Sequence, residues 1–234
     1  MSRLIVGKNA VREILSSGEP EKVYLQSSNK ELLDIAKRKG VKVEIVNKEK
    51  LDSLTKENHQ GAVALAPDFK YYQINELVSD ENTSLIVILD GLKDPHNLGA
   101  ILRTCEATNV DGVIIPKNRS VRLSDTVSKT STGAMELVKV SEVTNLSQTI
   151  DYLKKNGYWI VGAEHEDKST NYWDLDYNMK IALVIGSEGE GISRLVKENC
   201  DFLVDIPMMG KINSLNASVS TALIIYEIRR KQRK

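Results

Sequence analysis

Three short segments of the chain combine residue types that could bind a ligand and perform chemistry. The first, residues 89–106, runs from an apolar strand end through a polar turn into a helix. We expect Asn97 to cap this helix and Arg103, six residues further on in its second turn, to project a planar guanidinium toward a ligand near the strand end. Helical arginines also commonly pair with a neighbouring acid, here Glu106, and that interpretation stays open.

The second segment, residues 182–193, places three glycines within six residues between a buried strand and a helix. Its spacing is neither GxGxxG nor a Walker A sequence, which disfavours a phosphate-binding loop. Glu188 and Glu190 would repel a phosphate, so the loop suits a ligand with donors or positive charge, such as a nucleoside that bears a sulfonium group. The alternative is a tight turn that needs glycine only for backbone freedom.

The third segment, residues 204–220, begins as a buried strand, stops at Pro207 and continues into the last helix. Asn213, Ser214 and Asn216 cluster at the start of that helix, where they would either cap it or bind a ligand together with its free N–H groups. Helical spacing relates five apolar residues that we expect to pack one face of this helix into the core: Leu215, Val219, Ala222, Leu223 and Tyr226.

The elements that must position these segments alternate along the second part of the chain. Strand-like apolar runs occupy residues 85–89, 112–115, 159–161, 181–185 and 202–206. Helical stretches follow at residues 97–108, 146–156, 192–199 and 215–230. Buried strands that alternate with helices predict an α/β fold with a parallel sheet covered on both faces, and ligands at the carboxyl ends of its strands. All three segments follow such strand ends.

A separate small domain is expected before this sheet. Residues 1–66 alternate short strands and helices, the first helix capped by Asn9, and form a compact αβ module. Residues 67–83 shift to Asp, Asn, Lys, Tyr and Glu, which predicts a linker. The second domain is then residues 84–234.

Composition and cysteine usage exclude several classes of protein. No segment reaches the ~20 apolar residues of a membrane span, and the apolar run at the N-terminus is too short for a signal peptide. We therefore expect a cytoplasmic protein with no membrane partner. The two cysteines and three histidines lack metal-ligand spacing, so neither a metal site nor a disulfide framework is expected.

Charge is unevenly distributed although the chain is neutral overall. Residues 1–70 hold 13 Lys or Arg and 10 Asp or Glu, and the last six residues hold five bases and no acid. Basic ends of this kind could steer an anionic polymer toward the protein, or they could be solvated tails, and the charge alone favours neither.

Taken together and in this order, the three segments resemble the signature motifs of the SpoU/TrmH 2′-O-ribose methyltransferases of the SPOUT superfamily. The match covers roughly residues 85–230 and reads NxGaixRt, GsEGeGis and iPM…NSLNaSvs. Residues 1–66 are similar in size and pattern to the L30e-like RNA-binding domain that many members carry. The pattern is most similar to the subgroup that methylates a guanosine of large-subunit (23S) ribosomal RNA.

The resemblance implies a fold and a cofactor. The family's catalytic domain is a parallel sheet tied into a deep trefoil knot, one of the rare exceptions to unknotted chains. S-adenosylmethionine (S-adenosyl-L-methionine) lies in that knot, held mainly by backbone groups. Gly186, Ile206 and Leu215 match the main-chain contact positions, with Met208 and Asn216 as further cofactor contacts.

The resemblance also implies catalytic residues. The family's essential arginine falls on Arg103, with Asn97, Glu188, Ser214 and Asn216 as its companions in the three motifs. The reaction is an in-line methyl transfer to a ribose 2′-hydroxyl that must lose its proton. Because a guanidinium with a pKa above ~12 is a poor base, we expect Arg103 to clamp a phosphate or the hydroxyl, and solvent could accept the proton.

An RNA partner and a homodimer are implied as well. Arg119 and Arg122 lie in a loop, residues 117–122, that the family uses near RNA, and a plain solvated loop is the alternative. The family pairs through the first and last helices of the knotted domain. Three isoleucines of the last helix lie outside the stripe assigned to the core and are expected to serve this interface: Ile224, Ile225 and Ile228.

Three alternatives stay open. A related enzyme that acts on transfer RNA would share every catalytic residue. A non-catalytic RNA-binding or ribosome-assembly protein would have no need of the Arg103, Glu188 and Asn216 set. A Rossmann-type nucleotide enzyme is disfavoured by the absence of GxGxxG.

Overall fold

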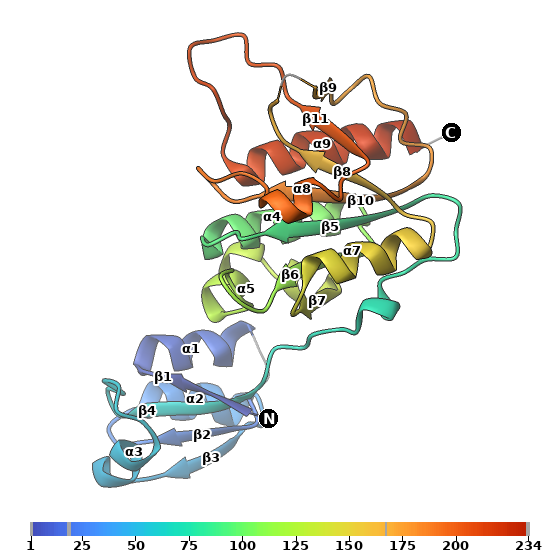
Figure 1. The fold of residues 1–234 in the computed structure, drawn as a ribbon. Coiled ribbons are helices and arrows are strands. Elements are labelled where there is room, and N and C mark those ends of the chain that lie inside the picture. Colours follow the sequence, from blue (N-terminus) through green and yellow to red (C-terminus); the bar gives the residue numbers. More distant parts are fainter. Residues whose placement is uncertain (1, 18–19, 167, 233–234) are drawn as a thin grey trace. The chain divides into compact units, whose positions relative to one another are not determined.

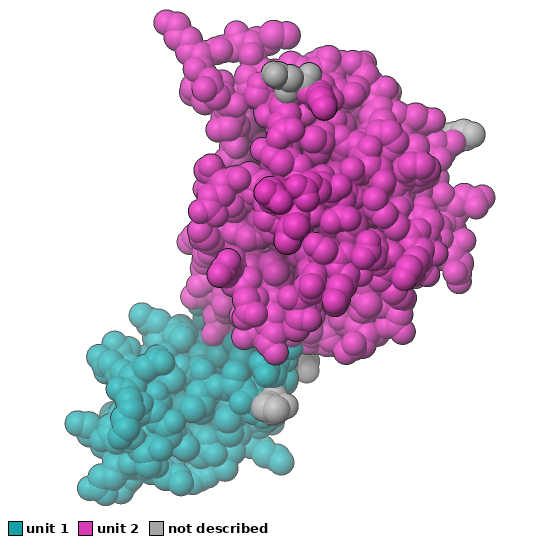
Figure 2. Space-filling view, viewed as in Figure 1, with its two compact units in different colours: residues 1–69 teal, residues 70–234 magenta. Residues whose placement is uncertain are grey.

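The computed structural model describes residues 2–17, 20–166 and 168–232. The chain divides into two compact units, residues 1–69 and 70–234, which Figure 2 colours separately. Each unit has a hydrophobic core of its own.

Unit 1 is a four-stranded sheet with packed helices (Figure 1). Its strands are β1 (Ser2–Val6), β2 (Lys22–Leu25), β3 (Lys42–Ile45) and β4 (Ala62–Pro67), in the order β1-β4-β2-β3. β4 is antiparallel to β1 and β2, and β2 is parallel to β3. The helices are α1 (Lys8–Ser17), α2 (Lys30–Arg38) and α3 (Lys48–Leu54). α1 begins at Lys8, so Asn9 lies within the helix and does not cap it.

Residues 70–83, most of the predicted linker, pack on unit 2. The Tyr72 backbone N–H donates to the Val140 carbonyl (2.8 Å), and the short 3₁₀ helix η1 (Ile74–Glu76) leads to Leu77, which is buried in the unit 2 core. Gly112 makes room for this side chain, because a Cβ on Gly112 would lie 2.2 Å from Leu77 Cγ. The segment is therefore part of the packing of unit 2.

Unit 2 contains a seven-stranded sheet in which all observed strand pairs are parallel. The strands are β5 (Ser84–Asp90), β6 (Gly112–Pro116), β7 (Val140–Val143), β8 (Trp159–Ala163), β9 (Thr170–Asn171), β10 (Lys180–Gly186) and β11 (Phe202–Asp205). Their order is β7-β6-β5-β10-β8-β11-β9. β10 therefore lies between β5 and β8, although a long stretch of chain separates it from β5 (Figure 1).

Helices cover both faces of this sheet, as buried parallel strands require. They are α4 (Pro95–Ala107), α5 (Asp125–Ser131), α6 (Ala134–Leu137), α7 (Leu146–Lys155), α8 (Arg194–Lys197) and α9 (Ala217–Gln232). Ile150 of α7 and Val196 of α8 share a core cluster with Ile88 and Val184 of the sheet. α4 and α9 contact each other on the other side (Figure 1). None of the helices in the described part of the chain is long and apolar enough to cross a membrane.

The helix after β5 starts two residues earlier than the sequence predicts. Asp94 caps it, since its Oδ1 accepts a hydrogen bond from the His96 N–H (2.9 Å), and Pro95 occupies the first helical position, where its missing N–H costs nothing. Asn97 therefore lies inside the first turn and is not the cap. Arg103 accordingly lies in the third turn, not the second.

Four short elements were not predicted from the sequence: α5, α6, β7 and β9. Each is too short for a periodic hydrophobic signal. The predicted helix over 192–199 shrinks to the four residues of α8, and the last helix starts at Ala217, so Leu215 precedes it.

The core-facing side of α9 is the opposite of the predicted one. Of the five residues predicted to face the core, Ala222 is half-buried, and the other four are 38–58% exposed: Leu215, which precedes the helix, Val219, Leu223 and Tyr226. Ile224, Ile225 and Ile228 are buried. Both sets of residues have helical spacing, so periodicity alone could not decide which set faces the sheet. The three isoleucines are therefore used inside the unit, and the exposed apolar stripe of α9 is the other one.

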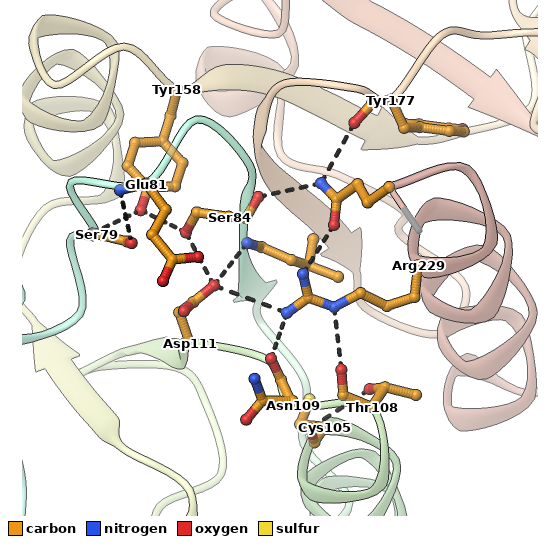
Figure 3. A network of polar contacts seen from close by, with 12 residues as sticks. Ser79, Glu81, Ser84, Cys105, Thr108, Asn109, Asp111, Tyr158, Tyr177 and Arg229 are labelled. Carbon is orange, nitrogen blue, oxygen red and sulfur yellow. Dashed lines mark hydrogen bonds and ion pairs between the residues drawn. The ribbon is translucent and has the colours of Figure 1, made fainter. Parts of the chain in front are cut away.

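The basic C-terminal residues make intramolecular contacts. Arg229 donates to the Thr108 and Asn109 carbonyls at the end of α4, and its guanidinium lies 3.7 Å from Asp111 (Figure 3). Lys231 donates to the Leu175 carbonyl (2.8 Å). Arg229 and Lys231 are therefore not part of a solvated basic tail, because they tie α9 to the rest of unit 2, and Arg233 and Lys234 lie outside the described residues.

Candidate active site

One polar network joins a residue from each of the three sequence segments. Asn97 Nδ2 donates a hydrogen bond to Glu188 Oε1 (2.9 Å). Asn216 Nδ2 lies within donating distance of Asn97 Oδ1 (3.0 Å) and of Glu188 Oε1 (3.1 Å). Three residues that are far apart in sequence thus meet at the carboxyl-terminal side of the parallel sheet, where α/β folds bind ligands.

The local structure holds each member of this network in place. Asn97 is buried in the first turn of α4, directly after the Asp94 cap. Asn216 Oδ1 accepts hydrogen bonds from the Ser218 N–H (2.9 Å) and hydroxyl (2.6 Å) at the start of α9, which leaves the amide N–H₂ to face Glu188. Glu188 itself is exposed in the glycine-rich loop between β10 and α8.

The glycine-rich loop is closed by its own backbone. Ser187 and Gly191 exchange two backbone hydrogen bonds of 3.0 Å. A Cβ on Gly186 would lie only 2.1 Å from the Gly191 carbonyl carbon, so no larger residue fits there without moving the loop. Gly191 has a left-handed φ of 66°. The tight-turn interpretation of these glycines therefore holds, whatever the loop binds.

Two carboxylates that the sequence analysis did not select hold this loop from both sides. Glu164, just after β8, accepts a hydrogen bond from the Ile192 N–H (Oε2, 2.9 Å), and Asp90, at the end of β5, accepts one from the Ser193 N–H (Oδ2, 2.7 Å). β5 and β8 are the neighbours of β10, so the loop after β10 is tied to both adjacent strands. In the sequence, Glu164 and Asp90 each stand at the end of an apolar run, and this position is the signal by which they could have been selected.

A cavity of about 160 Å³ lies next to the ends of β8 and β11. Four of the predicted site residues line it: Ile206, Met208, Ser214 and Leu215. Gly186 and Asn216 do not. The lining also includes the acids Glu164 and Asp205, of which Asp205 has a partner in His165 (Oδ2 to Nδ1, 3.1 Å), but no Lys or Arg. The cavity therefore suits a ligand with an apolar ring and positive charge and disfavours a phosphate. These residues fit S-adenosylmethionine, which offers both adenine and a sulfonium.

The predicted arginines differ in how they are engaged. Arg103 is exposed on α4 and, within the described ranges, makes neither an ion pair with Glu106 nor any other polar contact. Arg119 is also exposed. Arg122 donates to Glu142 (Nε to Oε1, 2.6 Å), and this hydrogen bond raises the pKa of the Arg122 guanidinium. Arg122 is therefore partly committed to an internal ion pair.

The two cysteine thiols are not activated as nucleophiles. Burial raises the pKa of both thiols, Cys105 and Cys200, to about 12, so they stay protonated near neutral pH. In the part of the chain that the structure describes, no three His, Cys, Asp or Glu side chains gather as metal ligands.

A parallel sheet covered on both faces, with a polar network and a cavity at its strand ends, is the architecture of α/β proteins that bind ligands at the carboxyl ends of their strands. A sequence profile described as the SpoU rRNA Methylase family matches residues 84–226. A second, described as RNA 2′-O ribose methyltransferase substrate binding, matches residues 4–72. The chain belongs to the SpoU/TrmH family of RNA methyltransferases, which confirms the resemblance in the sequence motifs.

Relatives match along nearly the whole chain. A protein of Staphylococcus haemolyticus named as a TrmH family tRNA/rRNA methyltransferase is 49% identical over 239 residues, which cover 98% of this chain and 96% of the relative. The SpoU methyltransferase AviRb of Streptomyces viridochromogenes, crystallised in complex with S-adenosylmethionine, has a TM-score of 0.74 at 22% identity, over 99% of this chain and 90% of that one. A TrmH/SpoU tRNA-modifying enzyme of A. aeolicus has a TM-score of 0.60 at 31% identity, over 68% and 80%.

Proposed function

We propose that this protein transfers a methyl group from S-adenosylmethionine to the ribose 2′-hydroxyl of a guanosine in 23S ribosomal RNA. The proposal rests on the hydrogen-bonded network of Asn97, Glu188 and Asn216, which contains one residue from each of the three motifs. The nearby cavity is suited to a nucleoside with positive charge. The names of the relatives support an RNA substrate without separating ribosomal from transfer RNA.

Different residues of unit 2 would bind the cofactor and hold the target nucleotide. Ile206, Met208 and Leu215 would enclose the adenine and exclude water, and Glu164 and Asp205 would favour the positive charge of the cofactor. Bound S-adenosylmethionine would supply a methyl group on a sulfonium sulfur for transfer to the ribose oxygen, and the proton of the 2′-hydroxyl would pass to solvent. Arg103 would hold a phosphate or the hydroxyl of the target nucleotide, since its guanidinium is a clamp and not a base.

The proposed enzyme is a knotted homodimer, as the family resemblance implies. The exposed stripe of Val219, Leu223 and Tyr226 on α9, with Leu215 just before the helix, supports the dimer, because an apolar stripe of this kind is expected to be covered in solution. A second subunit would also supply partners for the exposed Arg103. The trefoil knot stays a prediction.

Titration with S-adenosylhomocysteine tests the cofactor assignment. We expect micromolar binding and a higher melting temperature without added metal, because a ligand specific to the folded state stabilises it by mass action. ATP and NAD serve as controls with the same adenosine moiety. Binding of either nucleotide together with no binding of S-adenosylhomocysteine would contradict the proposal.

Ribose-methylation mapping tests the substrate. RNA from cells that lack the protein should miss one 2′-O-methylguanosine in 23S ribosomal RNA, detected by mass spectrometry, and purified protein should restore it in vitro. A methyl group missing only from transfer RNA would favour the second candidate, a transfer RNA methyltransferase. Full methylation of both RNA classes in the deletion strain would refute the proposed activity.

A further inference from the structure

A second and larger hollow opens where β5, β6 and β10 end. Its volume is about 800 Å³, within the ~300–1,000 Å³ of sites that enclose a whole ligand. Residues of three segments line it: 90–93, 116–121 and 187–193. These segments converge on Gly91, where a Cβ would lie 3.6 Å from Ser187 Cβ and 3.9 Å from the Arg119 carbonyl oxygen.

The hollow adjoins the polar network but is separate from the cavity beside Ile206. Residues 90–93 lead directly into α4, which carries Asn97, and Glu188 lies in the segment 187–193. The two hollows have no lining residue in common. Asn97 and Glu188 do not line the larger hollow, so a ligand there would contact the loops that lead to these two residues without occupying the space assigned to the cofactor.

The hollow presents two cations and two carboxylates. Lys93 Nζ lies 4.0 Å from Glu190 Oε2, and both side chains are at least 70% exposed, so this pair is weak and both groups can bind a ligand. Arg119 makes no hydrogen bond or ion pair with other described side chains. Asp90 is half-buried at the end of β5 and uses Oδ2 for the Ser193 N–H, which leaves Oδ1 to accept a further hydrogen bond.

We propose that this hollow binds the target nucleotide, an inference that rests on the proposed function. The Watson–Crick edge of guanine would lie at Asp90, and the neighbouring phosphates would lie at Lys93 and Arg119. Guanine is the base whose Watson–Crick edge offers two adjacent donors, N1–H and N2–H₂, and a carboxylate is a pure acceptor. Lysine and arginine are the usual phosphate contacts. A nucleotide extruded from its stack into such a pocket is read by hydrogen bonds to that edge.

Asp90→Asn tests the assignment in the full-length protein. The amide oxygen of asparagine can still accept the Ser193 N–H, while its N–H₂ presents donors to the donors of guanine. We expect kcat/KM for the RNA substrate to fall at least tenfold and S-adenosylhomocysteine affinity to stay within twofold of the wild type. Unchanged kcat/KM and unchanged base choice in this variant would overturn the inference.

Inosine at the mapped target position separates base recognition from a merely structural role. Inosine lacks the N2 amino group of guanine, so the wild type should lose about tenfold in kcat/KM, and Asp90→Asn should lose clearly less for the same change. Equal inosine penalties in both proteins would overturn the role of Asp90. A wild-type chain that methylates no RNA would instead refute the proposed function itself.

A second variant tests the site if Asp90→Asn also impairs cofactor binding. The double variant Lys93→Ala/Arg119→Ala should raise the KM for RNA about tenfold and lower the salt dependence of RNA binding, because two phosphate contacts are lost. Lys155→Ala, which removes an exposed lysine of α7 outside the hollow, is the matched control and should leave both unchanged. An RNA KM equal to that of the control would overturn the inference.

Discussion

At the scale of single residues, the site combines a hydrogen-bonded network with one arginine, Arg103, that makes no polar contact within the described part of the chain. Asn97, Glu188 and Asn216 are joined by three hydrogen bonds, so removing one side chain breaks two of them and leaves only the bond between the other two. Arg103 is exposed, and no polar contact to another described residue depends on it. Its removal should therefore affect chemistry without affecting the fold.

Arg103→Ala is expected to lower kcat by about 100-fold or more, the typical effect of deleting one group that stabilises transition-state charge. Melting temperature and S-adenosylhomocysteine affinity should stay at wild-type values. Methyl transfer from labelled cofactor to RNA measures the first, and calorimetry measures the other two. Asn97→Ala should differ by losing stability as well, because it removes two of the three hydrogen bonds of the network.

A matched control for this prediction is Arg194→Ala. Arg194 is another exposed arginine, and its partner is Glu198, directly after the short helix α8, so its loss should leave turnover near the wild-type value. If Arg103→Ala turns over as fast as Arg194→Ala, Arg103 has no part in the reaction.

At the scale of secondary-structure elements, α9 packs one apolar face on the sheet and exposes a second apolar face. Ile224, Ile225 and Ile228 are buried, while Leu223 is 40% exposed and Tyr226 is 58% exposed. A helix that is apolar on both sides needs a second partner to cover it. We expect that partner to be a second copy of the chain.

Leu223→Asp should convert the dimer into a monomer, because a carboxylate would be buried without a counter-ion in the proposed interface. Light scattering at micromolar concentration measures the mass. Leu195→Asp places the same charge on α8, where Leu195 is 63% exposed, and should leave the dimer intact. A wild-type protein that is already monomeric at that concentration would show the dimer proposal to be wrong.

At the scale of the whole molecule, the two units have separate cores and separate family matches. The structure places the useful truncation point before residue 70, because Tyr72 and Leu77 pack on unit 2. A cut near Asn75, in the middle of the predicted linker, would sever η1.

A protein of residues 70–234 should keep S-adenosylhomocysteine binding and lose most of its affinity for RNA. The slope of log affinity against log salt should also fall, because the phosphate contacts that we expect unit 1 to make would be lost. Filter binding at several salt concentrations measures both quantities. Methylation of ribosomal RNA at the full-length rate by the truncated protein would mean that unit 2 alone recognises the RNA.

The sequence by itself determined the alternation of buried strands and helices, the cofactor-type loop and the polar residues of the three motifs. Apolar runs and glycine spacing are local properties, so a single sequence reveals them. The same local signals failed for α5 and β7, which are too short to show a period, and for the start of α4, where Asp94 rather than Asn97 provides the cap.

Only the tertiary structure decided which residues meet. The order of strands in the sheet places β10 between β5 and β8, and this brings Asp90 and Glu164 to the loop that carries Glu188. It also decided which stripe of α9 is buried, because two stripes with the same helical spacing are equivalent until a neighbouring surface covers one of them. Contacts between distant segments depend on how the strands are ordered in space, and spacing along the chain carries no record of that order.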